Sequence, residues 1–309
     1  MLLCYNVKNK YSLGLNMAVP IQVIRLSVLG VVIAGFVTFK YVAAAMIEDK
    51  IDMAMTKAGI PTESFSYDTS VDLLGFNTHL KNIELTLPNK ESVKIDEITI
   101  NSFDADHKIP EFMDIEIEGL ESKKALKSLP FARASRDIFD NMEKVNVNFA
   151  IKYKFDSEDK ILDIKEISES VDHLGELSFS TELHHIDSMQ SLLQRMMLNP
   201  YSLSVGKSEL AYKDDSLVEK IILMNAKQQG VSVSQYKEKV VQKLNKELDK
   251  IESKKSAALE KELLSAVIDF VEDSDEFSIS IDPQKPMTLR EMSTGNPSAN
   301  LEKLNLEIN

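Results

Sequence analysis

Cysteine is almost absent from this chain: Cys4 stands near the N-terminus, and the residues that follow it contain none. Without further thiols, the body of the protein has neither a disulfide framework nor a thiolate metal site. A cysteine-free body suits an oxidising compartment, in which no free thiol is left to mispair.

The short motifs of catalysis are also missing. The sequence contains no phosphate-binding P-loop, no glycine-rich dinucleotide turn, no G-x-S-x-G nucleophile elbow and no H-E-x-x-H zinc motif. His184 and His185 precede Asp187, which is a combination that metal sites use. Adjacent residues on a strand point to opposite faces, so we predict a histidine pair at a strand end rather than a metal site.

A second group of titratable residues, Asp104, Asp106 and His107, follows a predicted strand. Carboxylates are numerous throughout this sequence and fill the polar faces of its predicted strands and helices, where solvation explains them. We therefore predict a solvated loop at 104–107. The sequence predicts no catalytic residue, no metal site and no cofactor, and hence a protein that is not an enzyme.

Acidic residues are absent from the first 47 positions, which contain the basic residues Lys8, Lys10, Arg25 and Lys40. Of the 36 basic residues in the chain, the remainder therefore holds 32, against 49 acidic ones, a formal charge of −17. An acidic body repels phosphate backbones, so nucleic acid is not expected as a partner.

The longest hydrophobic segment spans 20–39. Its uncharged stretch, Leu26–Phe39, is about 21 Å long as a helix, and including 20–24 extends it to about 30 Å, the thickness of a hydrocarbon core. This requires Arg25 and Lys40 to reach opposite interfaces. With only basic residues upstream, the positive-inside rule predicts a bacterial inner-membrane protein with a cytoplasmic tail at 1–19, an anchor at 20–47 and a periplasmic domain at 48–309.

Other interpretations of the N-terminal segment stay open. Small residues at Ala43–Ala45 are compatible with a cleaved signal peptide, and a buried core helix is a third reading. Against cleavage, a helical pattern continues past the alanines through Ile47, Ile51 and Met55. Met17 is an alternative start of the chain.

Apolar and polar residues alternate with a period of two over much of the sequence after Pro61. The clearest case is 145–155, where six apolar residues alternate with Asn, Ala and Lys. Such strands have one dry and one wet face, which is typical of antiparallel sheet. Related phrases at 80–87, 94–101, 113–120 and 301–308 are either similar strands stacked in one long curved sheet or ordinary amphipathic strands.

Helical patterns interrupt the strands. They predict a broken connection at 121–143, a short helix at 186–198, and helices that begin with capping boxes at Ser216 and Ser232. The last is predicted as one long amphipathic helix over 232–271. The expected fold class is thus α+β: an N-terminal membrane helix followed by a curved antiparallel sheet with packed helices.

The layout of tail, membrane helix, connecting helix and strands such as VDLLGFNTHLKNIELTLPNKESVKIDEITI resembles AsmA-like bacterial envelope proteins, most closely over 20–120. The resemblance implies a sheet with a groove that accommodates lipid, and a role in lipid transfer or envelope maintenance. We accordingly expect a binder of lipids or other hydrophobic ligands, with membrane lipids as partners. The predicted groove residues are Val145, Val147, Phe149, Ile151, Tyr153 and Phe155.

A non-enzymatic structural scaffold of the cell envelope is the alternative function. In that case the sheet is fully covered, and the helix at 232–271 presents a surface to envelope protein partners. The two hypotheses differ in whether the apolar strand faces line an open site or form a filled core.

Overall fold

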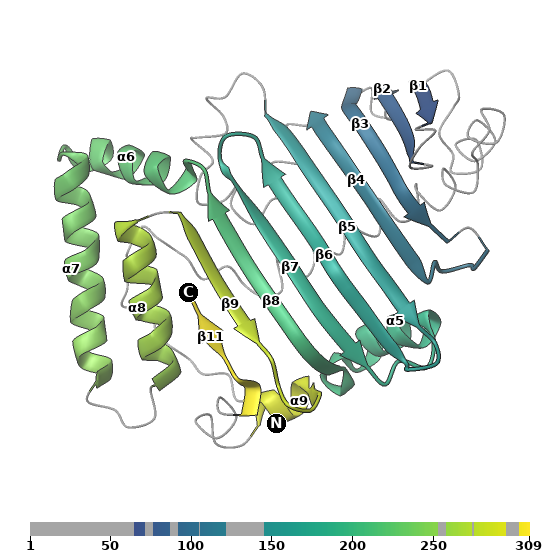
Figure 1. Cartoon of the computed structure of the whole chain (residues 1–309). Coiled ribbons are helices and arrows are strands. Elements are labelled where there is room, and N and C mark those ends of the chain that lie inside the picture. The colour runs from purple at the N-terminus through teal and green to yellow at the C-terminus, as the bar shows by residue number, and fades with distance from the viewer. Residues whose placement is uncertain are drawn as a thin grey trace.

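The computed structural model describes residues 65–71, 77–86, 92–104, 106–121, 145–252, 258–273, 275–294 and 303–309. These residues form one antiparallel sheet of eleven strands (Figure 1). Its order follows the chain from β1 to β9, with β11 beside β9 at the edge and the short β10 paired with β8. Neighbouring strands are therefore mostly consecutive in sequence, as in a β-meander, and their antiparallel pairing agrees with the period-two pattern.

Most strands are nine to twelve residues long. The long ones are β2 (Thr78–Thr86), β3 (Ser92–Phe103), β4 (Phe112–Glu121), β5 (Asn146–Asp156), β6 (Ile161–Val171), β7 (Gly175–His184) and β8 (Ser204–Asp214). The shorter ones are β1 (Phe65–Val71), β9 (Glu276–Ile281), β10 (Met287–Thr288) and β11 (Glu307–Ile308).

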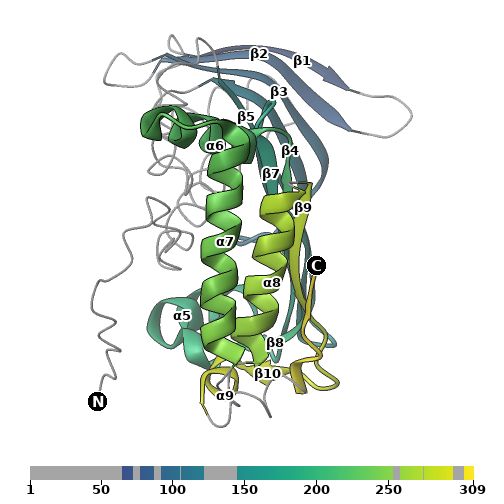
Figure 2. The ribbon, with the colours of Figure 1, turned by 90° about the vertical axis from the view of Figure 1, so that its left-hand side faces the viewer.

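The described helices connect strands at the C-terminal half of the sheet. They are α5 (Met189–Leu198), the 3₁₀ turn η2 (Pro200–Ser202), α6 (Leu217–Gln229), α7 (Val233–Glu252), α8 (Ala258–Glu272) and α9 (Leu289–Ser293). In Figure 2, α5 and α6 lie on the same side of the sheet, at opposite ends of its strands. The pair α7 and α8 stands beside β9 and β11.

The prediction of one long helix over 232–271 is wrong, because the structure has two helices there, α7 and α8, which pack against each other. Their apolar stripes meet: Tyr236 and Val240 of α7 are buried with Val271 of α8 and Ala226 of α6. An amphipathic stripe satisfied within a helical hairpin has no need of a partner protein. The expected surface for envelope partners on this helix stays untested.

One capping box was predicted correctly and one was not. Ser232 and Gln235 satisfy each other's backbone N–H groups at the start of α7. At α6, however, the side chain of Ser216 makes no cap; the N–H of Val218 donates to the carboxylate of Asp214 at 3.0 Å instead. Asp214 is the last residue of β8, and the strand holds its carboxylate within hydrogen-bond distance of the Val218 N–H group.

The two ends of the strands are closed by two separate apolar clusters. The larger cluster includes Phe155 and Leu162 of β5 and β6, against Met189 and Leu192 of α5. The other includes Val147 and Val171, against Leu217 of α6. Both lie on the side of the sheet that carries the helices, and we call this side the apolar face.

The predicted fold class and its membrane topology are wrong. The structure is mostly one large antiparallel sheet with few helices, rather than α+β with a membrane helix. Within the described ranges, no helix combines the length and apolar character needed to cross a bilayer. We therefore correct the single-pass topology, the inner-membrane location and the periplasmic placement. The segments predicted as tail, anchor and broken helix, 1–19, 20–47 and 121–143, lie outside the described residues.

Candidate functional site

An unbroken row of apolar side chains crosses the apolar face, and we call it the central row. Its members are directly paired in register across eight strands, β3 to β9 and β11. At about 4.8 Å between strands, the row is about 34 Å long. Its residues are Ile100, Ile115, Ile151, Ile167, Phe179, Leu210, Ile279 and Ile308.

Burial along the central row is uneven. Ile100 and Ile115 are buried at 7% and 3% exposure, whereas Ile151 and Ile167 are only half-buried and Phe179 is 38% exposed. The helices that close the strand ends thus leave the middle of β5 to β8 partly open. Ile151, Ile167 and Phe179 are neighbours in register, so they form a contiguous, partly exposed apolar surface of the kind that can bind another apolar molecule.

A second row lies next to the central row, two residues toward α6 along β6, and contains a carboxyl group. Its members are Ile98, Ile117, Phe149, Glu169, Leu177, Tyr212 and Phe277. Glu169 pairs with Phe149 on one side and Leu177 on the other. Because directly paired residues point to the same face, its side chain lies among apolar neighbours.

Glu169 is buried, with 9% exposure, and its Oε1 has no hydrogen-bond partner. Burial raises the pKa of this carboxyl from its ordinary value to about 7. Loss of hydration disfavours the charged form, and no neighbouring cation offsets that loss. Glu169 was missed at the sequence level, although a signal existed: it occupies a position between Ile167 and Val171 that the period-two pattern reserves for apolar residues.

The structure places five of the predicted groove residues on one face of β5 and the sixth, Val145, immediately before this strand, and their burial differs. Four are core: Val145, Val147, Tyr153 and Phe155 have between 0% and 8% exposure. The two in the middle, Phe149 and Ile151, are half-buried and belong to the two rows. The candidate site is therefore shorter along β5 than predicted, and it extends across β6, β7 and β8, none of which contributed a predicted residue.

The other face of the sheet is polar and held by charged pairs. Lys152 Nζ lies 2.5 Å from Asp114, and Lys81 lies 3.3 Å from Glu97. Because the lysine side chains are exposed, such pairs contribute little stability, but they mark this face as the hydrated one.

On the polar face, one histidine of β2, His79, contacts a carboxylate and a hydroxyl. Nδ1 of His79 meets both Glu97, at 2.7 Å, and Thr99, at 3.2 Å. A relay of the serine-protease kind needs the base and its orienting carboxylate on different ring nitrogens, so this arrangement does not activate the hydroxyl.

The prediction of a solvated loop at 104–107 is wrong for Asp104, which is 4% exposed. Its carboxylate accepts hydrogen bonds from the backbone N–H groups of Asp106, His107 and Glu111 and from the His107 ring. Burial raises the pKa of Asp104, but these donors more than compensate and hold it below its ordinary value. Asp104 thus organises the β3–β4 connection.

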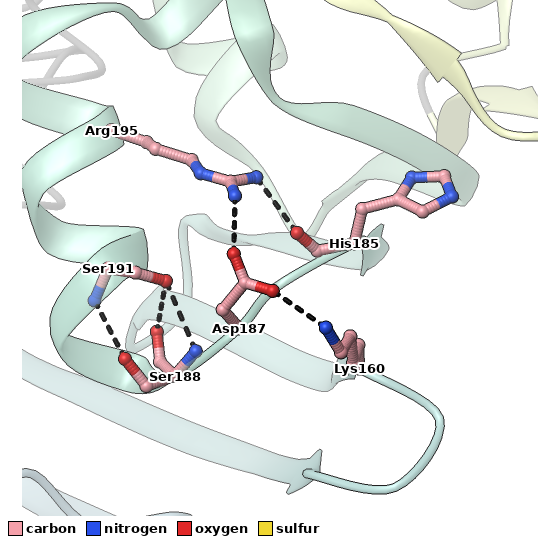
Figure 3. A network of polar contacts seen from close by, with 6 residues as sticks. All are labelled: Lys160, His185, Asp187, Ser188, Ser191 and Arg195. Atoms are coloured by element: carbon pink, nitrogen blue, oxygen red, sulfur yellow. Dashed lines mark hydrogen bonds and ion pairs between the residues drawn. The ribbon is translucent and has the colours of Figure 1, made fainter.

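His184 and His185 do lie at a strand end, as predicted: β7 ends at His184. Figure 3 shows Asp187 turned toward Lys160 and Arg195 rather than toward the imidazole ring of His185. Its oxygens lie 2.8 Å from Lys160 Nζ and 2.9 Å from the Arg195 guanidinium, which also donates to the His185 carbonyl. Together with the Ser188–Ser191 capping box, these contacts fix the start of α5, which packs against the apolar face.

A polar hollow of about 440 Å³ opens at the β6–β7 turn. It is lined by Asp172, His173, Glu176, Lys213 and Asp215, with Ser170 and Val171. Both oxygens of Asp172 already accept hydrogen bonds from Asn146 and Asn148. Across the described ranges, no group of three or more His, Cys, Asp or Glu is arranged to hold a metal ion.

Comparison with known proteins adds one match. A family model described as "Uncharacterized protein" matches residues 168–309, which run from the end of β6 to the last residue. Neither a curated protein nor a solved structure matches the sequence. None of these comparisons links the chain to AsmA-like proteins, and the role in lipid transport that the resemblance implied is not retained.

Proposed function

We propose that this protein is a non-enzymatic binder of elongated hydrophobic molecules, which lie across the strands on the central row. The observation that carries the proposal is the uneven burial of that row: both strand ends are closed by helices, while Ile151, Ile167 and Phe179 between them remain partly exposed.

The size of the row suits a chain-like ligand. Burying about ten methylenes on it contributes about 8 kcal/mol, at about 0.8 kcal/mol each. Loss of translational and rotational freedom costs about 4 kcal/mol or more. The remainder, at most about 4 kcal/mol, corresponds to a dissociation constant of about 1 mM, with tighter binding only where the ligand gains further contacts.

The test is titration of the full-length protein with an uncharged pyrene-labelled dodecyl alcohol, followed by fluorescence. Phe179→Asp places a charge in the open part of the central row, where 38% exposure lets the fold tolerate it. We expect saturable binding to the unmodified protein and a loss of affinity of about tenfold or more in Phe179→Asp, equivalent to about 1.4 kcal/mol.

Ser178→Asp is the matched control, because it introduces the same charge at the neighbouring position of β7, on the polar face. Its affinity should equal that of the unmodified protein. If the folded protein binds no probe, or if both variants bind as the unmodified protein does, the proposal is wrong. A sheet whose apolar face serves only as core, as the scaffold alternative holds, gives that result.

A further inference from the structure

The unpartnered carboxyl of Glu169 lies at the border of the proposed binding surface. It stands two residues from Ile167 along β6, about 7 Å from the central row. Its direct neighbours, Phe149 and Leu177, are both half-buried and offer no hydrogen-bond donor from their side chains.

No other member of the two rows supplies a donor to this carboxyl. Tyr212 is the only further polar side chain in them, and its hydroxyl donates to Asp214 at 2.7 Å. A buried acceptor without a donor destabilises the protein by about 1–3 kcal/mol, and more when it is charged. Such a group is well suited to bind a donor that arrives with a ligand.

We propose that Glu169 binds the protonated amine of a cationic amphiphile whose hydrocarbon chain lies on the central row. This inference rests on the proposed function and adds the chemical class of the head group. The ammonium donates to Oε1, and the ion pair forms away from bulk water, between Phe149 and Leu177.

The charge of the protein favours a cation over an anion. The chain has a formal net charge of −13, which repels fatty acids and attracts amines at long range. An ionised carboxylate only accepts hydrogen bonds, and its bonds to a charged donor are roughly twice as strong as those between neutral groups. An alcohol of the same chain length offers a donor without the charge and is the natural comparison.

The experiment is calorimetric titration of the full-length protein at pH 8 with dodecylamine and dodecanoate below their micelle concentrations and with dodecanol below its solubility limit. We expect dodecylamine to bind at least about tenfold more tightly than dodecanol, and dodecanoate to bind most weakly. In Glu169→Gln, which preserves the side-chain shape, the advantage of the amine should disappear while the affinity for dodecanol stays within about twofold.

Glu166→Gln provides the matched control, because it removes the same charge from β6 on the polar face. It should retain the preference for the amine. Equal affinities for amine and alcohol, or a preference that survives in Glu169→Gln, would overturn the head-group assignment and leave the proposed function intact. Absence of binding by all three amphiphiles would instead refute the proposed function itself. Circular dichroism confirms that each variant is folded.

Discussion

Phe149 pairs directly with Glu169 across β5 and β6, so that a half-buried aromatic ring lies beside a buried carboxyl that has no partner for Oε1. The period-two pattern of β6 predicts an apolar residue at position 169, between Ile167 and Val171. Glu169 interrupts the apolar pattern of this face, next to the part of the central row that remains partly exposed. Local sequence rules are commonly broken at functional positions.

Glu169 makes the stability of the protein depend on pH in a predictable direction. Its pKa is raised on folding to about 7, from an ordinary 4.5, so the folded state binds the extra proton between these values. The contribution of Glu169 to the free energy of unfolding is complete below pH 4.5 and is lost as the pH rises through 7. The loss amounts to about 3 kcal/mol.

We therefore expect Glu169→Gln to match the unmodified protein in unfolding free energy near pH 4.5 and to exceed it by about 3 kcal/mol at pH 8. Urea unfolding of both proteins across this range measures the difference. A difference that is constant with pH would mean that the carboxyl is not desolvated in the folded state.

Two phenylalanines on the apolar face should respond differently to truncation. Phe155, at 5% exposure, packs in the cluster with Leu162 and α5, so Phe155→Ala should cost about 3–5 kcal/mol. Phe179 is 38% exposed, so Phe179→Ala should lower the free energy of unfolding by no more than about 2 kcal/mol. The same substitution should weaken binding of the dodecyl probe. Denaturant unfolding gives both costs, and equal values would place Phe179 in a filled core.

Asp104 should be required for the β3–β4 connection. Asp104→Ala leaves three backbone N–H groups without their acceptor and should cost about 3 kcal/mol, whereas Asp104→Asn retains an acceptor oxygen and should cost less. Because the folded pKa of Asp104 is lowered from 3.8, its stabilising contribution is present above that value and is lost as the pH falls below it. Asp104→Asn has no carboxylate at this position, so its free energy of unfolding should not show this loss at acid pH.

Asp187 should control how firmly α5 is held. It lies between Lys160 and Arg195, on the surface, so its replacement by Asn should change global stability little. The expected effect is local: faster amide hydrogen exchange in α5, with the exchange of β5 and β6 unchanged. Uniformly faster exchange throughout the sheet would show that the ion pairs support the whole fold.

Much of the sheet was predictable because its strands are amphipathic. The alternation over 145–155 predicted β5 and its two faces, and the related segments at 94–101 and 113–120 lie in β3 and β4. The strands β6 and β8 were not predicted, because Glu169 occupies an apolar-face position of the first and Ser208, which pairs with Thr181, an apolar-face position of the second.

The break between α7 and α8 and the open middle of the apolar face were not predictable in the same way. A helical stripe has the same period whether the helix continues or folds back on itself, so the pattern over 232–271 did not reveal a hairpin. Similarly, alternation identifies the apolar face of β5 but not which part of it a helix covers. That depends on where α5 and α6 dock, which is a tertiary property.

The most direct test of the central claim is to locate a bound chain by photolabelling. An uncharged dodecyl alcohol with a diazirine near the end of its chain, irradiated with the full-length protein, should label Ile151, Ile167 and Phe179 or their strand neighbours. Unlabelled dodecanol should compete with the reaction. Labelling confined to the exposed residues Met197 and Leu198 of α5, or labelling that dodecanol does not reduce, would contradict binding on the central row.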